Sequence, residues 1–425
     1  MRLLPPLEGS WVRAPMLNCP VKGRATENMK ILYLSPEYAG ETVTGGLGTY
    51  TANISRGMAL LGHDVHVLVC APRLTRRDSR DDGVELHFRP VPMLPWPRPL
   101  PNFWATRSRL ATALAFLREY RKLGMNFDVV QASEYMAPAL FLARSVPSLI
   151  VRVSAPASLI LECDGLPLGT DNAWAAQLER RAIRQARTIV SPSRFMERSL
   201  RDRGWLDGRT VTIAPSPVDV DAWSGPLRAA ETAPTVLAVG RMDQAKGLDV
   251  LVEAAGMLLP VVPDLQLVLV GRSSGRNTGP AYEDLLAEKA KMLGVSCTFA
   301  GERRRSELLH YYTEARVVVM ANRFDNMSNV GLEALAAGRP LVCTTSSGIS
   351  ELVERTDPAA VVPADDAQQL ADAMGRYLAS PSLAAQMGQR GQELVRAELS
   401  LSVTSRKMEA LYNEIVAKPK EVRTG

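Results

Sequence analysis

Short apolar runs rich in β-branched residues alternate along the chain with longer segments of helical periodicity, beginning near Met29. Buried parallel strands are typically continuous apolar runs of this length, and helices connect each strand to the next. The first half contains predicted strands at 30–35, 64–70, 128–133, 149–155 and 188–193, and predicted helices at 47–62, 104–123 and 174–187. This alternation predicts an α/β domain with a doubly wound parallel sheet.

The same rhythm starts again after Asp219. The second half contains predicted strands at 235–240, 265–271, 297–301, 316–321 and 340–345, and predicted helices at about 246–259, 282–293 and 330–337. This series predicts a second α/β domain. Two such sheets that face each other form a cleft at the carboxyl ends of their strands, where open α/β sheets bind ligands.

A segment with several prolines and turn formers separates the two series: "APSPVDVDAWSGP", 214–226, which is typical of an interdomain hinge. The length of 425 residues is too great for one ordinary core and suits two domains. We therefore divide the chain into an N-terminal extension, a first domain, a second domain and a C-terminal segment containing one more helix, with bounds 1–28, 29–218, 219–398 and 399–425.

Composition narrows the class of protein. With 46% hydrophobic and 22% charged residues, the chain has the composition of a folded globular protein, and its net charge of +5 is too mild for a nucleic-acid coat. The five cysteines are odd in number and scattered, as expected for reduced thiols. Neither a signal peptide nor an apolar run of roughly 18 residues is evident. We expect a cytoplasmic protein.

Two glycines precede the first predicted helix in "TGGLGTYT", 44–51. They lie about ten residues beyond the end of a strand, whereas a dinucleotide-binding fingerprint places its glycines directly after the strand. Without side chains, Gly45 and Gly46 would let backbone amides approach a ligand closely. The alternative is an ordinary glycine turn.

A pair of cations follows the first strand of the second domain in "VGRMDQAKGLD", 239–249. The strand ends at Gly240, so Arg241 lies at the strand tip and Lys246 at the entry to the next helix. Both would converge on the cleft, where fixed cations stabilise the charge of a departing diphosphate by about 3 to 4 kcal/mol each. The alternative is that both form surface salt bridges.

Two carboxylates flank a predicted helix start in "RFDNMSNVGLEALAAGRPLV", 323–342. Ser328 or Asn329 can cap a helix over about 330–337, so Asp325 lies in the preceding loop and Glu333 one turn inside the helix.

The start of this helix offers an anion site, because its first amides, at Asn329, Val330 and Gly331, have no partner within the helix. Glu333 on the same face could accept hydrogen bonds from a diol such as ribose, and Asp325 from a sugar hydroxyl. The alternative for Glu333 is a favourable position near the positive end of the helix dipole.

Taken together, these motifs resemble those of the retaining glycosyltransferases with two Rossmann-like domains, the GT-B type, and specifically the large family 4. The resemblance rests on Gly240-Arg241, Lys246-Gly247, Asp325, Glu333 and "ALAAGRP" in this order and spacing. It extends to "MKILYLSPE" and "TGGLGTYT" near the front of the chain, "PSPVDVDAW" at the hinge, and the closing helix.

The resemblance implies two Rossmann-like doubly wound parallel-sheet domains that face an interdomain cleft. The first would bind the acceptor, the second a nucleoside-diphosphate sugar, and the C-terminal helix would cross back to the first. The implied reaction moves a sugar with retention of configuration to a hydroxyl acceptor, such as a small natural product, a lipid or a glycan. UDP is the commoner nucleotide in the family and GDP the alternative. No protein base is implied, because the leaving phosphate takes the acceptor proton.

Roles for individual residues also follow from the resemblance. Arg241 and Lys246 would clamp the donor diphosphate, Glu333 would hold the ribose, and Asp325 would meet the transferred sugar. The full set expected to bind the donor is Gly45, Gly46, Gly240, Arg241, Lys246, Asn329, Val330, Gly331 and Glu333.

The sequence departs from the family pattern at two positions. Asp325 stands where the family has glutamate, so its carboxylate reaches about one methylene less and favours a different sugar hydroxyl or a bulkier sugar. Ser154, in "RVSAP", stands where the family often has histidine. Glu134, in "QASEY", is a candidate acid of the acceptor site, although the sequence favours the alternative of an exposed, solvated carboxylate.

No metal or cofactor is expected beyond the donor. "VDVDAW" contains Asp219 and Asp221 at the spacing that another transferase fold uses for a divalent ion, but it lies in the hinge, which favours a structural role.

Segment 96–122 joins tryptophans to a helix with apolar Leu110 and Leu114, and we favour a core helix over a membrane-surface patch.

Two other functions remain open from the sequence. An epimerase on the same scaffold would also bind a nucleotide sugar, although four histidines offer few groups for proton transfer. A nucleotide-sugar binding protein without turnover would tolerate both Asp325 and Ser154. The sequence gives no indication of the oligomeric state.

Overall fold

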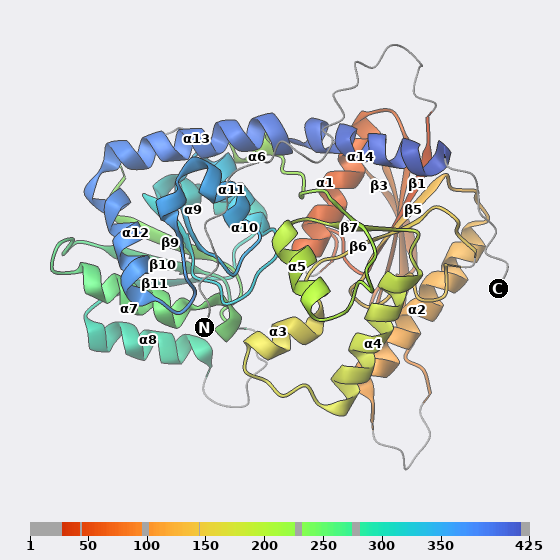
Figure 1. Ribbon diagram of the computed structural model, residues 1–425, viewed down its shortest axis with the longest axis horizontal. Helices are drawn as coiled ribbons and strands as arrows, with labels where there is room; N and C mark the ends of the chain where they lie inside the picture. The colour runs from red at the N-terminus through yellow and green to blue at the C-terminus, as the bar shows by residue number, and fades with distance from the viewer. Residues whose placement is uncertain are drawn as a thin grey trace.

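The protein forms two α/β domains that lie side by side and are bridged by long C-terminal helices (Figure 1). The computed structural model describes residues 28–42, 45–95, 102–143, 145–225, 232–273 and 281–417. The predicted N-terminal extension, except for Asn28, and part of the predicted segment 96–122 lie outside these ranges.

The first domain is built on a sheet whose eight described strands run in the order β3-β4-β2-β1-β5-β6-β7-β8. Neighbouring strands are parallel except for β3 and β4, which form an antiparallel edge. The strands are β1 Lys30–Ser35, β2 Asp64–Ala71, β3 Arg77–Asp81, β4 Val84–Pro90, β5 Val129–Ser133, β6 Leu149–Arg152, β7 Thr188–Ser191 and β8 Val211–Ile213. The helices are α1 Gly46–Leu60, α2 Trp104–Leu123, α3 Ala157–Cys163, α4 Thr170–Gln185 and α5 Arg194–Asp202.

The second domain has a sheet of six described strands in the order β11-β10-β9-β12-β13-β14, with every described pair parallel. The strands are β9 Thr235–Val239, β10 Gln266–Val270, β11 Ser296–Gly301, β12 Val317–Met320, β13 Leu341–Thr344 and β14 Val361–Val362. The helices are α6 Val220–Trp223, η1 Gln244–Lys246, α7 Leu248–Leu258, α8 Tyr282–Leu293, α9 Arg305–Glu314, α10 Asn329–Ala336, α11 Ser350–Thr356, η2 Pro358–Ala360 and α12 Ala367–Ala379.

Both faces of each sheet are covered, as parallel sheets require. In β1, Ile31 and Tyr33 join one apolar cluster of the first domain, while Leu32 and Leu34 join the cluster on the opposite face. The predicted fold class, two doubly wound Rossmann-like domains, is therefore confirmed. The antiparallel edge strand β3 was not predicted, because its sequence, "RDSRD", is too polar to resemble a buried strand.

The strand order places a topological switch point in each sheet. From β9 the chain moves outward to β10 and β11, and then returns to β12 on the other side of β9. The loops after β9 and β12 therefore diverge, which leaves a crevice at the carboxyl ends of these two strands. In the first sheet β1 has the same position, between β2 and β5.

Helix α2 belongs to the core of the first domain, where Phe116 is buried, and it packs along α4. The predicted apolar face of this helix is partly wrong, because Leu114 is 41% exposed and small residues such as Ala111 and Ala115 contact the core instead. Leucine spacing misled the prediction because alanines allow the closest approach of helix to sheet.

The chain crosses between the domains at two adjacent points. The backbone amide of Val218 donates to the carbonyl of Leu399 (2.9 Å), so the linker that leaves the first domain lies beside the segment that returns to it. The returning chain consists of α13 Pro381–Leu399 and α14 Leu401–Ala417, which run across both domains along the upper edge of Figure 1. Helix α14 packs on α1 and adds Met408 and Tyr412 to the first domain's core.

A buried polar network holds the linker to the first domain. Arg152, at the end of β6, stacks on the ring of Tyr50 (3.9 Å) and donates to the carbonyl of Ala214 (2.7 Å) and the hydroxyl of Ser216 (3.0 Å). The guanidinium therefore ties the hinge to the sheet by hydrogen bonds rather than by an ion pair.

We predict that Gly57→Leu weakens the docking of α14. A side chain at Gly57 would overlap the hydroxyl of Ser405, and overpacking of this kind costs roughly 1 to 3 kcal/mol. Thermal unfolding should show a lower midpoint, and limited proteolysis should release a C-terminal fragment. Gly169→Leu is the control, because a Cβ there meets nothing within 4 Å. Equal effects of the two variants would contradict the close packing of α1 and α14.

Candidate active site

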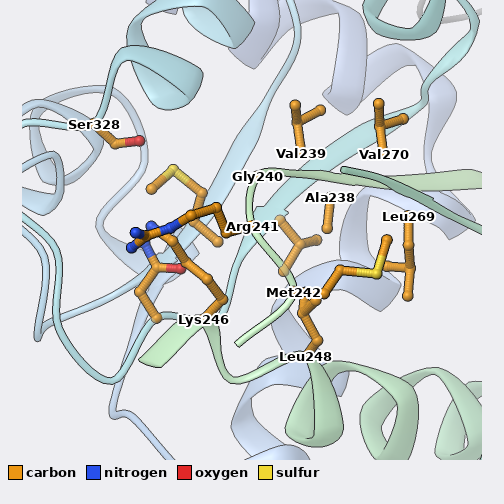
Figure 2. A pocket seen from close by; sticks show the side chains of 13 residues that line it. Ala238, Val239, Gly240, Arg241, Met242, Lys246, Leu248, Leu269, Val270 and Ser328 are labelled. Atoms are coloured by element: carbon orange, nitrogen blue, oxygen red, sulfur yellow. The ribbon is translucent and has the colours of Figure 1, made fainter. Parts of the chain in front are cut away.

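A pocket opens at the switch point of the second domain, at the carboxyl ends of β9, β10 and β12 (Figure 2). Its apolar floor comes from the last residues of these strands. Its polar side is formed by Arg241, Lys246, Asn322 and Ser328. Figure 2 shows Arg241 and Lys246 beside each other, with Ser328 across from them. The structure thus brings together residues that lie almost ninety positions apart in the sequence.

Local backbone geometry delivers Lys246 to this pocket. The short helix η1 ends at Lys246, and Gly247 takes a left-handed conformation (φ +60°) before α7 begins. A side chain at Gly247 would overlap the backbone carbonyl of Ala321, so glycine is required both for the turn and for the approach to β12. This explains why lysine and glycine occur together here.

Lys246, which lines the pocket, forms an ion pair with Asp325, with 2.8 Å between Nζ and Oδ2. The same carboxylate oxygen accepts from the amide of Asn322 (2.8 Å), and Oδ1 accepts from the backbone amide of Asn326 (2.8 Å). Asp325 is therefore held in one orientation. Arg241 keeps 45% of its side chain exposed, but its partner Asp243 (3.3 Å) is buried. Neither cation therefore pairs between two exposed side chains, and the predicted alternative of surface salt bridges is wrong.

Helix α10 points its open N-terminus at the pocket. It begins at Asn329, one residue before the predicted start, and Ser328 makes no side-chain capping hydrogen bond. The amides of Asn329, Val330 and Gly331 are therefore available to an anion. Gly331 also has a packing role, because a Cβ there would lie 2.7 Å from Ile349 and 3.1 Å from the sulfur of Met320.

The N-terminus of α1 lies on the other side of the cleft. Asn329 donates from its side chain to the carbonyl of Gly46 (2.9 Å), which joins the starts of α10 and α1. Gly45 precedes α1, and a side chain there would press against the carboxylate of Glu37. Burial raises the pKa of Glu37, while the nearby Arg241 opposes the rise. Glu37 therefore lies between Gly45 and the cation of Arg241, although sequence reasoning gave it no role.

Glu333 is 5% exposed and has partners for both carboxylate oxygens. Tyr312 donates its hydroxyl to Oε2 (3.1 Å), and Arg305 lies 3.4 Å from Oε1. Burial raises the pKa of Glu333 to about 7, and the charge of Arg305 limits that rise. Arg305 and Tyr312 were not predicted, because only the folded chain brings α9 against α10.

Glu134 is fully buried, so the predicted alternative of a solvated carboxylate is wrong. Ser154 donates to it twice, from its backbone amide and from its hydroxyl, both at 2.7 Å. Burial raises the pKa of Glu134 to about 7, and the charge of Glu179 adds to the rise. The structure therefore brings the two candidate acceptor-site residues together as one hydrogen-bonded unit, at the carboxyl ends of β5 and β6.

Asn326 connects this unit to the segment of the second domain that carries Asp325. Its side-chain amide donates to the carbonyl of Ser154 (3.0 Å), and its side-chain oxygen accepts from the hydroxyl of Ser193 (3.2 Å). Asn326 follows Asp325 directly in the chain. It therefore links Asp325, predicted to meet the sugar, to Ser154 and Glu134, predicted near the acceptor.

The aspartates of the hinge have structural roles. Asp219 caps α6 by accepting from the backbone amide of Ala222 (3.2 Å), and Asp221 pairs with Arg396 (2.9 Å). Across the described part of the chain, no group of three or more His, Cys, Asp or Glu side chains could hold a metal ion. Metal independence remains a prediction.

No helix in the described ranges is long and apolar enough to cross a membrane.

Comparison with known families decides the class of enzyme. Residues 45–216 match the family model described as "Glycosyl transferase 4-like domain", and residues 233–380 match "Glycosyl transferases group 1". Each model covers one domain of the structure. The chain is a glycosyltransferase of the GT-B type. The predicted transferase activity is confirmed at this level.

Individual relatives agree with this assignment. The alpha-D-kanosaminyltransferase of Streptomyces kanamyceticus is 26% identical over 84% of this chain and 97% of its own length. The sucrose-phosphate synthase of Thermosynechococcus elongatus has the same fold, with a TM-score of 0.75 and 21% identity over 91% of this chain and 99% of that one. Anabaena HepE, solved with UDP-glucose, gives a TM-score of 0.66 at 17% identity over 91% of this glycosyltransferase and all of HepE.

We predict that Glu134→Gln stabilises the protein at pH 8 but not near pH 4.5. The raised pKa of Glu134 means that the native state binds more protons than the unfolded state between the ordinary value of 4.5 and about 7. The free energy of unfolding therefore falls as the pH rises through this window. Glutamine does not ionise and avoids the cost, so we expect a thermal midpoint at least about 2 °C higher at pH 8.

The control for this prediction is Glu197→Gln on α5, which removes a surface pair with Arg201. It should leave the midpoint nearly unchanged at both pH values. If Glu134→Gln shifted the midpoint equally at pH 4.5 and pH 8, the buried carboxylate would not be the cause.

Proposed function

We propose that this glycosyltransferase moves a sugar from a nucleoside-diphosphate donor to a hydroxyl acceptor with retention of configuration, UDP being the favoured nucleotide and GDP the alternative. The observation that carries the proposal is the arrangement of Lys246. Its ammonium is held by Asp325 in the same pocket as Arg241 and faces the open start of α10. Two cations and a set of free amides at a switch point are suited to a diphosphate.

The nucleoside would lie toward α9 and α10. Glu333 accepts from Tyr312 on one oxygen and contacts Arg305 with the other. A carboxylate has about four lone-pair sites, so acceptor capacity remains for the two hydroxyls of a ribose. The donor nucleotide is inferred partly from the fold, since HepE was solved with UDP-glucose.

The transferred sugar would contact Asp325. Both oxygens of this carboxylate accept hydrogen bonds, from Lys246, Asn322 and the amide of Asn326. A carboxylate held in this way is better suited to bind a sugar hydroxyl than to act as a nucleophile. In the proposed step the bond between the anomeric carbon and the diphosphate oxygen breaks. The acceptor oxygen bonds to the same face of that carbon, and its proton passes to the departing phosphate. Arg241 and Lys246 stabilise the negative charge that develops.

The acceptor would enter beside Ser154 and Glu134, across the cleft from Asp325. Candidate acceptors are small natural products, lipids and glycans. The kanosaminyltransferase of Streptomyces kanamyceticus transfers a sugar named in the alpha configuration, and it covers most of this chain. Retention itself is proposed because the motifs of this chain resemble those of the retaining family 4.

The first test is nucleotide binding followed by product analysis. UDP and GDP should each be titrated in a thermal-shift assay, and the better ligand defines which nucleotide sugars to test by mass spectrometry with panels of hydroxyl acceptors. We expect stabilisation by one diphosphate and transfer of a sugar from the matching donor. The absence of stabilisation by any nucleoside diphosphate would contradict the proposed donor site.

We predict that Lys246→Ala lowers kcat/KM by about 100-fold or more, because the departing diphosphate loses a fixed charge. Steady-state kinetics with the donor and acceptor from the screen would measure this. Lys289→Ala on α8 is the matched control, since it removes an ion pair with Glu253 on the outside of the domain. Unchanged kinetics in Lys246→Ala would remove the lysine from the diphosphate site.

We predict that Asp325→Glu changes the preferred donor sugar and leaves the preferred nucleotide unchanged. The longer side chain moves the carboxylate by about one methylene toward the sugar, while Glu333 and α10 keep their places. Competition between donors that share a nucleotide but differ in the sugar would show the change. A donor profile identical to that of the unmodified enzyme would place Asp325 outside the sugar site.

A further inference from the structure

Arg305 touches three different parts of the structure. It is the first residue of α9, and one of its terminal nitrogens lies 3.4 Å from the carboxylate of Glu333 in α10. The other terminal nitrogen donates to the hydroxyl of Thr49 in α1, across the interdomain cleft, at 3.4 Å. Its guanidinium also stacks on Trp223 of α6, 4.8 Å from the ring. One side chain therefore connects helices α6, α9 and α10 of the second domain to α1 of the first domain.

The position of Arg305 is fixed by its neighbours. Trp223 is 2% exposed and packs edge-on against Tyr312, with 5.5 Å between ring centroids. Arg305 and Tyr312 are seven residues apart, so they lie on the same face of α9. Together they hold the two oxygens of Glu333. The buried ring of Trp223 beneath the guanidinium limits the rotamers that the Arg305 side chain can adopt.

Arg305 is the cation that faces Glu333 in the described structure. Tyr312 is the titratable neighbour from the same helix. The other elements packed against α10 contribute uncharged groups on this side: Thr49 and Trp223 lie around Arg305, and Gln392 of α13 donates to the carbonyl of Ala336. Strands β12 and β13 beneath the helix are apolar apart from Cys343 and Thr344, and burial raises the pKa of the Cys343 thiol, which keeps it uncharged. Removing Arg305 would leave a buried carboxylate with a single hydroxyl partner.

We propose that Arg305 is a positioning residue of the donor site, which keeps the carboxylate of Glu333 ionised and oriented for ribose and links it to Thr49 of the first domain. The inference rests on the proposed function, in which Glu333 binds the ribose. Ribose recognition then depends on Arg305 of α9. This arginine makes its full set of contacts only when the two domains are together.

The physical reason is the cost of an isolated buried charge. Glu333 already has its pKa raised to about 7 by burial, with Arg305 as the main opposing influence. Without that cation the pKa of the carboxyl would rise further, so the group would stay protonated and neutral up to a higher pH. A protonated oxygen loses acceptor capacity for the ribose hydroxyls. Ribose recognition would then need alkaline conditions.

The test measures ribose recognition directly. Calorimetric titrations of UDP and 2′-deoxy-UDP, and of GDP and 2′-deoxy-GDP, should be run between pH 6 and pH 9. The unmodified enzyme should prefer the ribonucleotide by about 10-fold above pH 7, the size expected for hydrogen bonds to a charged group. In Arg305→Met this preference should be lost at pH 7 and return toward pH 9. Arg305→Lys keeps the charge and should lie in between.

Kinetics provide a second measurement. At pH 7, Arg305→Met should raise the KM for the donor by about 10-fold with a smaller change in kcat, because the diphosphate clamp is intact. Arg355→Met, which removes an ion pair with Glu398 outside the cleft, should match the unmodified enzyme. Thermal unfolding of each variant would confirm that it is folded.

The outcomes separate the two proposals. If the unmodified enzyme prefers the ribonucleotide and Arg305→Met shows the same pH dependence, the role of Arg305 is overturned while the donor site stands. If the unmodified enzyme binds both forms of the nucleotide equally at every pH, Glu333 does not recognise ribose, and the role of Arg305 fails with it.

Discussion

The ion pair between Lys246 and Asp325 fixes one side chain of the pocket in the second domain. It joins the segments that follow β9 and β12, the two neighbouring strands whose connections diverge at the switch point. A partly buried pair contributes little by itself, because desolvation of the two charges offsets most of their attraction. Here Asn322 and the amide of Asn326 add hydrogen bonds to the same carboxylate, so the geometry is specified by several contacts. The lysine side chain is consequently held in one position, so in the proposed function the binding of a diphosphate would not have to order it.

Two carboxyls of the cleft, Glu134 and Glu333, reduce stability near neutral pH. Each is buried with its pKa raised to about 7, so ionisation in the folded state is costly. Apolar residues would pack more favourably in the same volume. Costs of this kind are commonly retained where function requires them. For Glu333 the proposed requirement is an ionised acceptor beside the nucleotide. For Glu134 the observed role is to hold Ser154, through two short hydrogen bonds, at the place where the family often has histidine.

Much of the fold was predictable because parallel strands are short apolar runs and the helices between them have their own period. Helix 104–123 and the strand at 30–35 have the predicted bounds. The apolar pattern did not predict strand β3, because an edge strand can be polar on both faces. The pocket residues Arg241 and Lys246 were found because their chemistry is tied to a strand end. The burial of Glu134 and the contacts of Arg305 could not be found, because they depend on which distant elements pack together. The catalytic roles of all these residues remain predictions.

Contacts between the domains involve residues of the site itself. Asn329 reaches Gly46, Asn326 reaches Ser154, and the backbone amide of Ala245, beside Lys246, donates to Asp164 of the first domain (3.1 Å). Each contact lies within one residue of a group assigned to the diphosphate or the sugar. Separation of the domains would therefore remove the supports of the donor pocket at the moment when the cleft opens to solvent. For the proposed reaction, this coupling predicts that the contacts to the donor exist only while the two domains are together, which would protect an activated sugar from hydrolysis.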